Sequence, residues 1–311
     1  MNNKLKRVNL NHSFIFFLFS NFIFLLTLKI INFTLAPIIC LLLILTIGVS
    51  HGSLDHTKGK KLLQILNIKG MYIFYLLYTL ISISIIILWI FAPSTSLIIF
   101  LIVASFHFGK EDTKFLIEEN SLLNQLLFFL KGSLIILAPI FFHFDETITI
   151  FRYLLIDNEA FYLTLEFIEV NNIIYTGILL STFSSIYLFL KNFEIKKITI
   201  FLDYFSILII NYFLSPLVAF TVYFCFLHSI RHSISLVYEI DKIDFKNGLK
   251  IFVKRALPLT ILTAILCVIG LYLLNNSYDL DNSILKIVFI GLASLTFPHI
   301  LLEYFLEKNE K

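Results

Sequence analysis

Long apolar runs separated by short polar segments dominate this chain. A transmembrane helix needs about 20 consecutive apolar residues to cross a hydrocarbon core about 30 Å thick. Ten runs reach or approach that length, near residues 13–31, 34–51, 71–92, 95–108, 122–143, 172–190, 198–214, 216–238, 256–274 and 283–305. The runs at 95–108 and 198–214 are short, so a tilted, broken or re-entrant segment stays open there. The pattern predicts an all-α, polytopic transmembrane helical bundle of about ten spans.

Composition supports a membrane environment. The chain is 59% hydrophobic and only 14% charged, whereas soluble domains carry about 25% charged residues. Its 311 residues suit a single integral membrane domain over residues 1–311, with a first span at about 13–31 and a motif-bearing bundle at about 34–305. The basic N-terminus precedes a long apolar stretch without a small-x-small cleavage site, which favours an uncleaved first helix. No basic patch with interleaved aromatics favours binding to nucleic acid.

The basic residues predict how the chain is oriented. Lys and Arg gather at the N-terminus and in the connections near 58–69, 110–114, 191–197 and 242–255, so every second connection is basic. The intervening connections are short or acidic, and the longest, 144–171, holds six acidic residues against one arginine. Because cytoplasmic loops carry the excess of Lys and Arg, we expect ten spans with both termini cytoplasmic, in the inner or plasma membrane of the cell.

In this topology six of the eight histidines fall in one layer near the cytoplasmic side. His228 and His232 are four residues apart in an apolar run, which places them on one face of a helix. Neutral imidazole is the commonest metal ligand, and polar groups inside a span mark functional sites. The other members of the layer are His51, His56, His107 and His299, whereas His12 and His143 lie outside it. The layer predicts an imidazole metal site.

Carboxylates follow two of these histidines. Asp55 comes shortly after His51, and Asp112 comes shortly after His107. A carboxylate commonly accepts a hydrogen bond from the second ring nitrogen of a metal-bound histidine. Asp55 and Asp112 are therefore candidate supporting residues around the ligands.

Other interpretations of these motifs stay open. The first motif is also compatible with a capped interfacial loop, and His107 with an aromatic belt. The pair His228 and His232 is also compatible with hydrogen bonds to neighbouring helices. For His299 a supporting position is favoured over that of a fifth ligand or a packing donor. Arg231, near the inner end of its span, is expected to snorkel toward lipid head groups.

The donor set indicates the class of metal. Carboxylates are almost absent at membrane depth apart from Asp203 at a span boundary, and the three cysteines form no Cys-x-x-Cys pair. An all-imidazole set suits Fe, Cu, Zn or Ni. Four imidazoles would leave positions for O₂ on Fe(II), and would close a tetrahedral structural site on Zn.

Four motifs together resemble the Brp/Blh family of membrane β-carotene 15,15′-dioxygenases. They are His51-Gly-Ser-Leu-Asp-His56, Phe106-His-Phe-Gly109 with Asp112, His228-Ser-Ile-Arg-His232 and Pro298-His299, and they follow the family's order over about residues 34–303. The resemblance implies a non-haem Fe(2+) held by His51, His107, His228 and His232. His56, Asp55, Asp112 and His299 match further family positions, to which we assign possible support of the ligands.

The resemblance also implies a reaction and its partners. The expected reaction is O₂-dependent cleavage of the central double bond of β-carotene, which gives two molecules of all-trans-retinal. A carotene would reach the site from the membrane lipid, and a microbial rhodopsin in the same membrane is an implied client for retinal. His51 is favoured over His56 as the ligand from the first motif because it ends the helix.

Three rival functions stay open at this point. A di-iron membrane desaturase or hydroxylase also groups histidines at one side of a bundle, but it needs more of them than this layer holds. A metal- or proton-coupled transporter needs polar groups along the whole path, and the outer half of the spans is nearly bare of them. Haem binding by paired histidines is the third rival, and a Soret band would reveal it.

Overall fold

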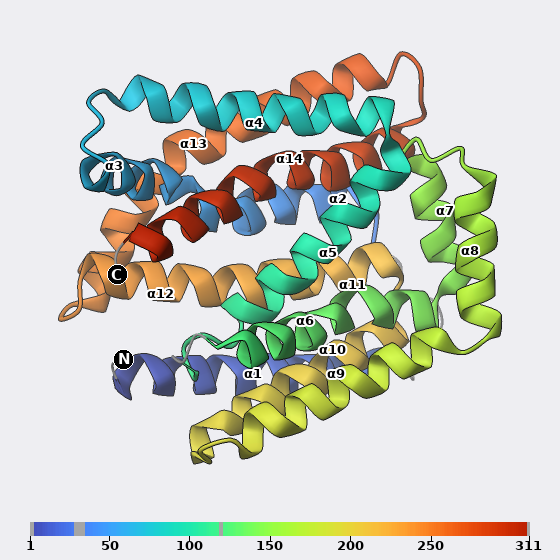
Figure 1. The fold of residues 1–311 in the computed structure, drawn as a ribbon, viewed down its shortest axis with the longest axis horizontal. Helices are drawn as coiled ribbons and strands as arrows, with labels where there is room; N and C mark the ends of the chain where they lie inside the picture. Colours follow the sequence, from blue (N-terminus) through green and yellow to red (C-terminus); the bar gives the residue numbers. More distant parts are fainter. Residues whose placement is uncertain (1–2, 28–34, 118–120, 310–311) are drawn as a thin grey trace.

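The computed structural model describes residues 3–27, 35–117 and 121–309, apart from the side chains of Asn3 and His51. Within these residues the chain forms helices and no strand (Figure 1). In chain order the helices are α1 (Asn3–Thr27), α2 (Pro37–Leu43), η1 (Ile44–Gly48), η2 (Val49–Leu54), α3 (Asp55–Ile65), α4 (Met71–Phe91), α5 (Pro93–Glu111), α6 (Leu122–Phe142), α7 (Phe144–Tyr153), α8 (Glu159–Val170), α9 (Ile173–Leu190), η3 (Ile195–Lys197), α10 (Ile198–Phe213), α11 (Pro216–Val222), η4 (Tyr223–Ser229), α12 (Ile230–Ile240), α13 (Phe245–Leu274) and α14 (Leu280–Asn309).

The predicted all-α bundle is confirmed. Among the described residues eight helical segments are long and apolar enough to cross a membrane, and each corresponds to one of the ten predicted runs. The run at 34–51 forms a helix bent by 41° against α3, which would make a ninth span. The run at 198–214 forms α10, which has only 16 residues. The predicted span ends at 28–31 and at residue 34 lie outside the described residues.

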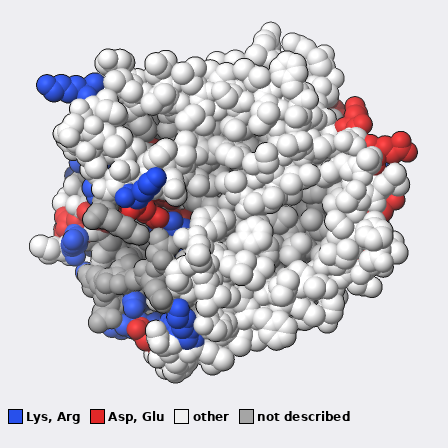
Figure 2. Space-filling model, in the orientation of Figure 1, with Lys and Arg blue, Asp and Glu red and all other residues white. Residues whose placement is uncertain are grey.

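Both ends of the described chain lie at the same end of the bundle, on the left of Figure 1. The long connection at 144–171 forms the helices α7 and α8, which cover the opposite end. On the face drawn in Figure 2, Lys and Arg gather at the left, whereas the right end carries Asp and Glu. The positive-inside rule assigns the end of a membrane protein with the excess of Lys and Arg to the cytoplasmic side. The cytoplasmic assignment of the left end stays a prediction.

Two glycines let α5 and α6 pack at backbone distance. A Cβ atom on Gly109 would lie 1.8 Å from the carbonyl oxygen of Phe128, and one on Gly132 would lie 1.9 Å from the carbonyl oxygen of Ser105. Small residues at helix interfaces allow such approach in membrane bundles. The contact fixes the C-terminal half of α5, which carries His107.

Two π-helical turns lie side by side at the centre of the bundle. The turn η1 precedes the segment that holds His51, and η4 contains His228. The Ser229 hydroxyl donates a hydrogen bond to the Gly48 carbonyl at 3.0 Å, which joins the two turns. Single π-helical turns are frequent at functional sites. They mark the region where the candidate site lies.

Candidate metal centre

Four buried imidazole rings from distant parts of the chain form one cluster. The ring centroids of His107 and His228 are 5.3 Å apart, and those of His107 and His299 are 5.4 Å apart. The ring of His232 lies 5.8 Å from that of His299. These residues come from α5, η4, α12 and α14. The side chain of His51, the remaining predicted ligand, lies outside the described part of the structure.

Asp112 orients His228. It follows the last residue of α5, and its Oδ1 lies 3.2 Å from Nδ1 of His228. The Tyr223 hydroxyl donates to Oδ2 of the same carboxylate at 2.6 Å. Burial alone would raise the pKa of Asp112, but His228 and then Arg231 lower it below the usual range. An ionised Asp112 therefore accepts from the ring nitrogen and directs the opposite nitrogen, Nε2, away from itself.

Asp55 has the same relation to His299. Both carboxylate oxygens of Asp55 lie 2.9 Å from Nδ1 of His299, and the Tyr78 hydroxyl donates to Oδ2 at 2.9 Å. The neighbouring His56 has its Nδ1 3.1 Å from the carbonyl oxygen of Ser53. The proximity of Asp55 to His299 was not foreseen, because 244 residues separate them in sequence.

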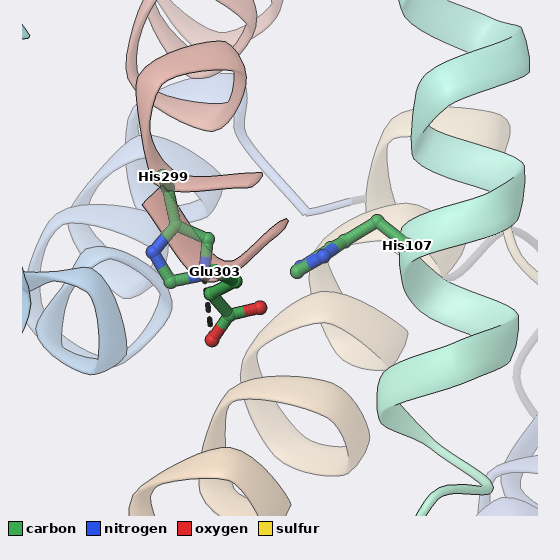
Figure 3. Close-up of side chains that lie close together, drawn as sticks. All are labelled: His107, His299 and Glu303. Atoms are coloured by element: carbon green, nitrogen blue, oxygen red, sulfur yellow. Dashed lines mark ion pairs between the residues drawn. The ribbon is translucent and has the colours of Figure 1, made fainter. Parts of the chain in front are cut away.

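The cluster also holds two glutamates. Oε1 of Glu303 lies 3.6 Å from Nε2 of His232 and 3.8 Å from Nε2 of His299, and Figure 3 shows it between His299 and His107. Oε2 of Glu111 lies 3.8 Å from Nδ1 of His232. The expectation that carboxylates are almost absent at this depth is therefore wrong. The spacing of Glu303, four residues after His299 on one helix, was the available signal.

Each glutamate has a lysine partner. Nζ of Lys58 lies 2.6 Å from Oε1 of Glu303, and Nζ of Lys114 lies 2.5 Å from Oε2 of Glu111. Burial would lower the pKa of Lys114, but Glu111 and then Glu303 raise it above the usual range. The two lysines therefore compensate negative charge at the cluster.

Arg231 is buried, so the prediction that it snorkels is wrong. Its side chain is 2% exposed, and its guanidinium holds both carboxylate oxygens of Asp203 at 2.7 and 2.9 Å. It also donates to the hydroxyl of Ser13 at 2.5 Å. A two-pronged pair of this kind satisfies a buried arginine. The pair ties α12 to α10 and α1 directly beside the cluster.

The two histidines predicted to lie outside the layer have other partners. Nε2 of His12 lies 2.8 Å from the carbonyl oxygen of Phe226, and Nε2 of His143 lies 2.8 Å from that of Asn211. Neither belongs to a group of donors that could share an ion within the described residues.

The donor set fits a first-row transition metal. His107, His299 and Glu303 form one group, and Glu111, His232 and Glu303 form another, with the donor atoms of each group within 4.8 Å of one another. Donors about 2.0–2.2 Å from one ion lie about 3–4 Å apart, so these spacings need little adjustment. Imidazole nitrogen with carboxylate oxygen suits iron among other ions of this series.

An apolar cavity of about 300 Å³ ends at the cluster. His56, His107 and His299 form part of its wall. The remaining lining is mostly apolar and comes largely from α4, α13 and α14, including Phe74, Tyr78, Leu259, Leu266 and Leu295. A cavity with a mostly apolar lining and few polar groups is typical of a site for an apolar ligand.

A comparison with known families decides the class. The family model for beta-carotene 15,15'-dioxygenase matches residues 42–307. The chain belongs to this family. The matched range includes the four described histidines of the cluster as well as Glu303. Membership makes the protein a carotenoid-cleaving oxidoreductase.

A curated relative agrees with the family. The chain is 29% identical over 268 residues to a beta-carotene 15,15'-dioxygenase from uncultured marine bacterium 66A03, a match that covers 84% of this chain and 90% of the relative. No solved structure matches the chain.

Proposed function

We propose that this chain cleaves the central 15,15′ double bond of β-carotene with O₂ and releases two molecules of retinal. Family membership supports carotene cleavage. The apolar cavity that ends at the histidine cluster supports this cluster as the place where the carotene reacts. Leu262 and Leu266 of α13 line the cavity and are 50% and 59% exposed, so the cavity is open on this side. The cavity therefore reaches the apolar surface that lipid would cover, and a hydrocarbon substrate can enter without crossing water.

The reaction balances without a reductant. One carbon–carbon double bond breaks, and each of its carbons takes one atom of O₂ to become an aldehyde. A bound Fe(2+) would supply the O₂ chemistry that side chains alone do not perform. The residues of the chain hold the donors in place, exclude water and keep the midpoint of the polyene beside the cluster.

The predicted ligands His51, His107, His228 and His232 are the residues that we propose to hold the iron. In support, the three whose side chains are described are buried in one cluster, and Asp112 orients His228. We propose that His56 and His299, which line the cavity, lie on the substrate side of the metal.

We further propose that the enzyme lies in the cell membrane with the metal centre toward the cytoplasmic side. The gathering of Lys and Arg near the ends of the described chain supports this orientation. The retinal product is apolar and would stay in the lipid, where a rhodopsin in the same membrane is the client that this activity would serve.

The test is pigment and metal analysis of cells that accumulate β-carotene and express the chain. We expect the wild type to form retinal and consume carotene, and His228→Ala to retain carotene and lose bound iron. His143→Ala is the matched control, because His143 bonds the Asn211 carbonyl away from the cluster. Unchanged carotene in cells with folded, iron-loaded wild type would refute the proposal. Wild-type activity and iron content in His228→Ala would refute the ligand assignment.

A further inference from the structure

Glu303 is the carboxylate near the middle of the histidine cluster, and the proposed ligand set does not use it. It lies one turn after His299 on α14, and its side chain is 12% exposed. Burying a carboxylate costs free energy unless charged or hydrogen-bonding partners compensate it. Lys58 compensates this charge from one side, and the same carboxylate faces the nitrogen atoms of His232 and His299.

The distances around Oε1 of Glu303 are compatible with donors to one ion. The atom lies 3.6 Å from Nε2 of His232 and 3.8 Å from Nε2 of His299. Both separations exceed the usual 2.7–3.2 Å of an N–H···O hydrogen bond. Two donors on one ion at the tetrahedral angle are about 3.5 Å apart. His107, on the other side of Glu303 in Figure 3, offers a nitrogen within 4.8 Å.

Lys58 holds the carboxylate in this place. Its Nζ lies 2.6 Å from Oε1 of Glu303 and reaches it from α3, 245 residues away in sequence. A carboxylate offers about four lone-pair sites on two oxygens, so it can accept from a lysine and bind a metal at once. Ligating carboxylates are commonly hydrogen-bonded by an outer partner. Lys58 has the same relation to Glu303 as Asp112 has to His228.

We propose that Glu303 binds the metal, so that the centre is a mixed histidine–carboxylate site rather than an all-imidazole one. The inference deepens the proposed function and rests on it for the identity of the metal as iron. Beside imidazole nitrogens such as those of His107 and His232, Glu303 would supply an anionic oxygen donor to the ion. Histidine–carboxylate sets with open positions are typical of non-haem Fe(II) oxygenases.

The experiment compares metal binding by the full-length chain in detergent. Wild type, Glu303→Gln and the control Glu307→Gln are titrated with Co(II), whose visible absorption reports the ligand set, and iron content is measured after loading with Fe(II). Glu307 is a suitable control because it lies one turn further along α14 and pairs with Lys110 at 2.5 Å, but it is 44% exposed. We expect Glu303→Gln to bind both ions at least about 10-fold more weakly, since the loss of an outer partner alone typically costs that much, and Glu307→Gln to match wild type.

Wild-type affinity and an unchanged Co(II) spectrum in Glu303→Gln would overturn the inference. If that variant does not fold, Glu303→Asp takes its place, because it keeps the charge and withdraws the oxygens. We expect it to bind Co(II) more weakly with a shifted spectrum, and a wild-type titration would equally overturn the inference. Retinal formation is assayed separately. A wild type that forms no retinal while Glu303→Gln loses its metal would refute the proposed function and leave the ligand assignment standing.

Discussion

Asp112 offers a sharp test of how the site is built. Its side chain is 3% exposed, and its two oxygens contact Nδ1 of His228 at 3.2 Å and the Tyr223 hydroxyl at 2.6 Å. The substitution Asp112→Asn keeps the shape of the side chain and removes its charge. An amide polarises the imidazole less than a carboxylate does, and its NH₂ group can face the ring nitrogen without accepting from it.

The expected effect is on metal affinity. Loss of an outer partner of a metal-bound histidine typically weakens binding about 10–100-fold, or about 1.4–2.7 kcal/mol. We expect the upper part of this range, because Asp112 is buried and the Arg231 guanidinium, 3.8 Å from Oδ1, also loses a neighbouring charge. Retinal formation at limiting iron should fall in proportion to occupancy.

The assay is titration of purified Asp112→Asn with Fe(II) and Co(II), followed by retinal formation at saturating iron. Asp145→Asn is the control, because Asp145 is an exposed residue of α7 at the opposite end of the bundle. An affinity within twofold of wild type in folded Asp112→Asn would refute the reasoning. Asp112 would then serve only as a structural partner of Tyr223 and Arg231.

Two further predictions concern packing and the cavity. Gly109→Ala should destabilise the protein by about 1–3 kcal/mol and reduce retinal formation, because its Cβ would meet the Phe128 carbonyl at 1.8 Å and push α5 with His107 away from α6. Thermal unfolding in detergent measures this, with Gly291→Ala, whose Cβ meets nothing within 4 Å, as the control; equal melting of the two variants would contradict the prediction. Thr263→Phe should fill part of the cavity and raise the KM for carotene while metal content stays unchanged. Wild-type kinetics in that variant would argue against the cavity as the substrate site.

The hydropathy of the chain by itself determined its class and most of its spans. Crossing lipid requires each backbone polar group to be satisfied within its own segment, so the length of an apolar run predicts a helix without knowledge of its neighbours. The eight described helices that are long and apolar enough to cross a membrane follow from this rule. Two runs are exceptions: the run at 34–51 belongs to a bent helix pair, and the run at 198–214 forms α10, which has only 16 residues. The positions of His107, His228, His232 and His299 along their helices likewise predicted that they would lie at one depth.

Only the tertiary structure decided which charged groups face one another at that depth. Lys58 and Glu303 form an ion pair although 245 residues separate them in sequence. Arg231 was predicted to reach the lipid head groups, but its guanidinium pairs with Asp203 on α10. The depth of a residue in the membrane follows from its position along its own helix. The rotation of that helix and the helices that it contacts depend on close packing, as at Gly109 and the π-helical turns. A charge is tolerated inside the bundle only where another helix supplies its partner, and hydropathy, which is local, carries no record of that partner.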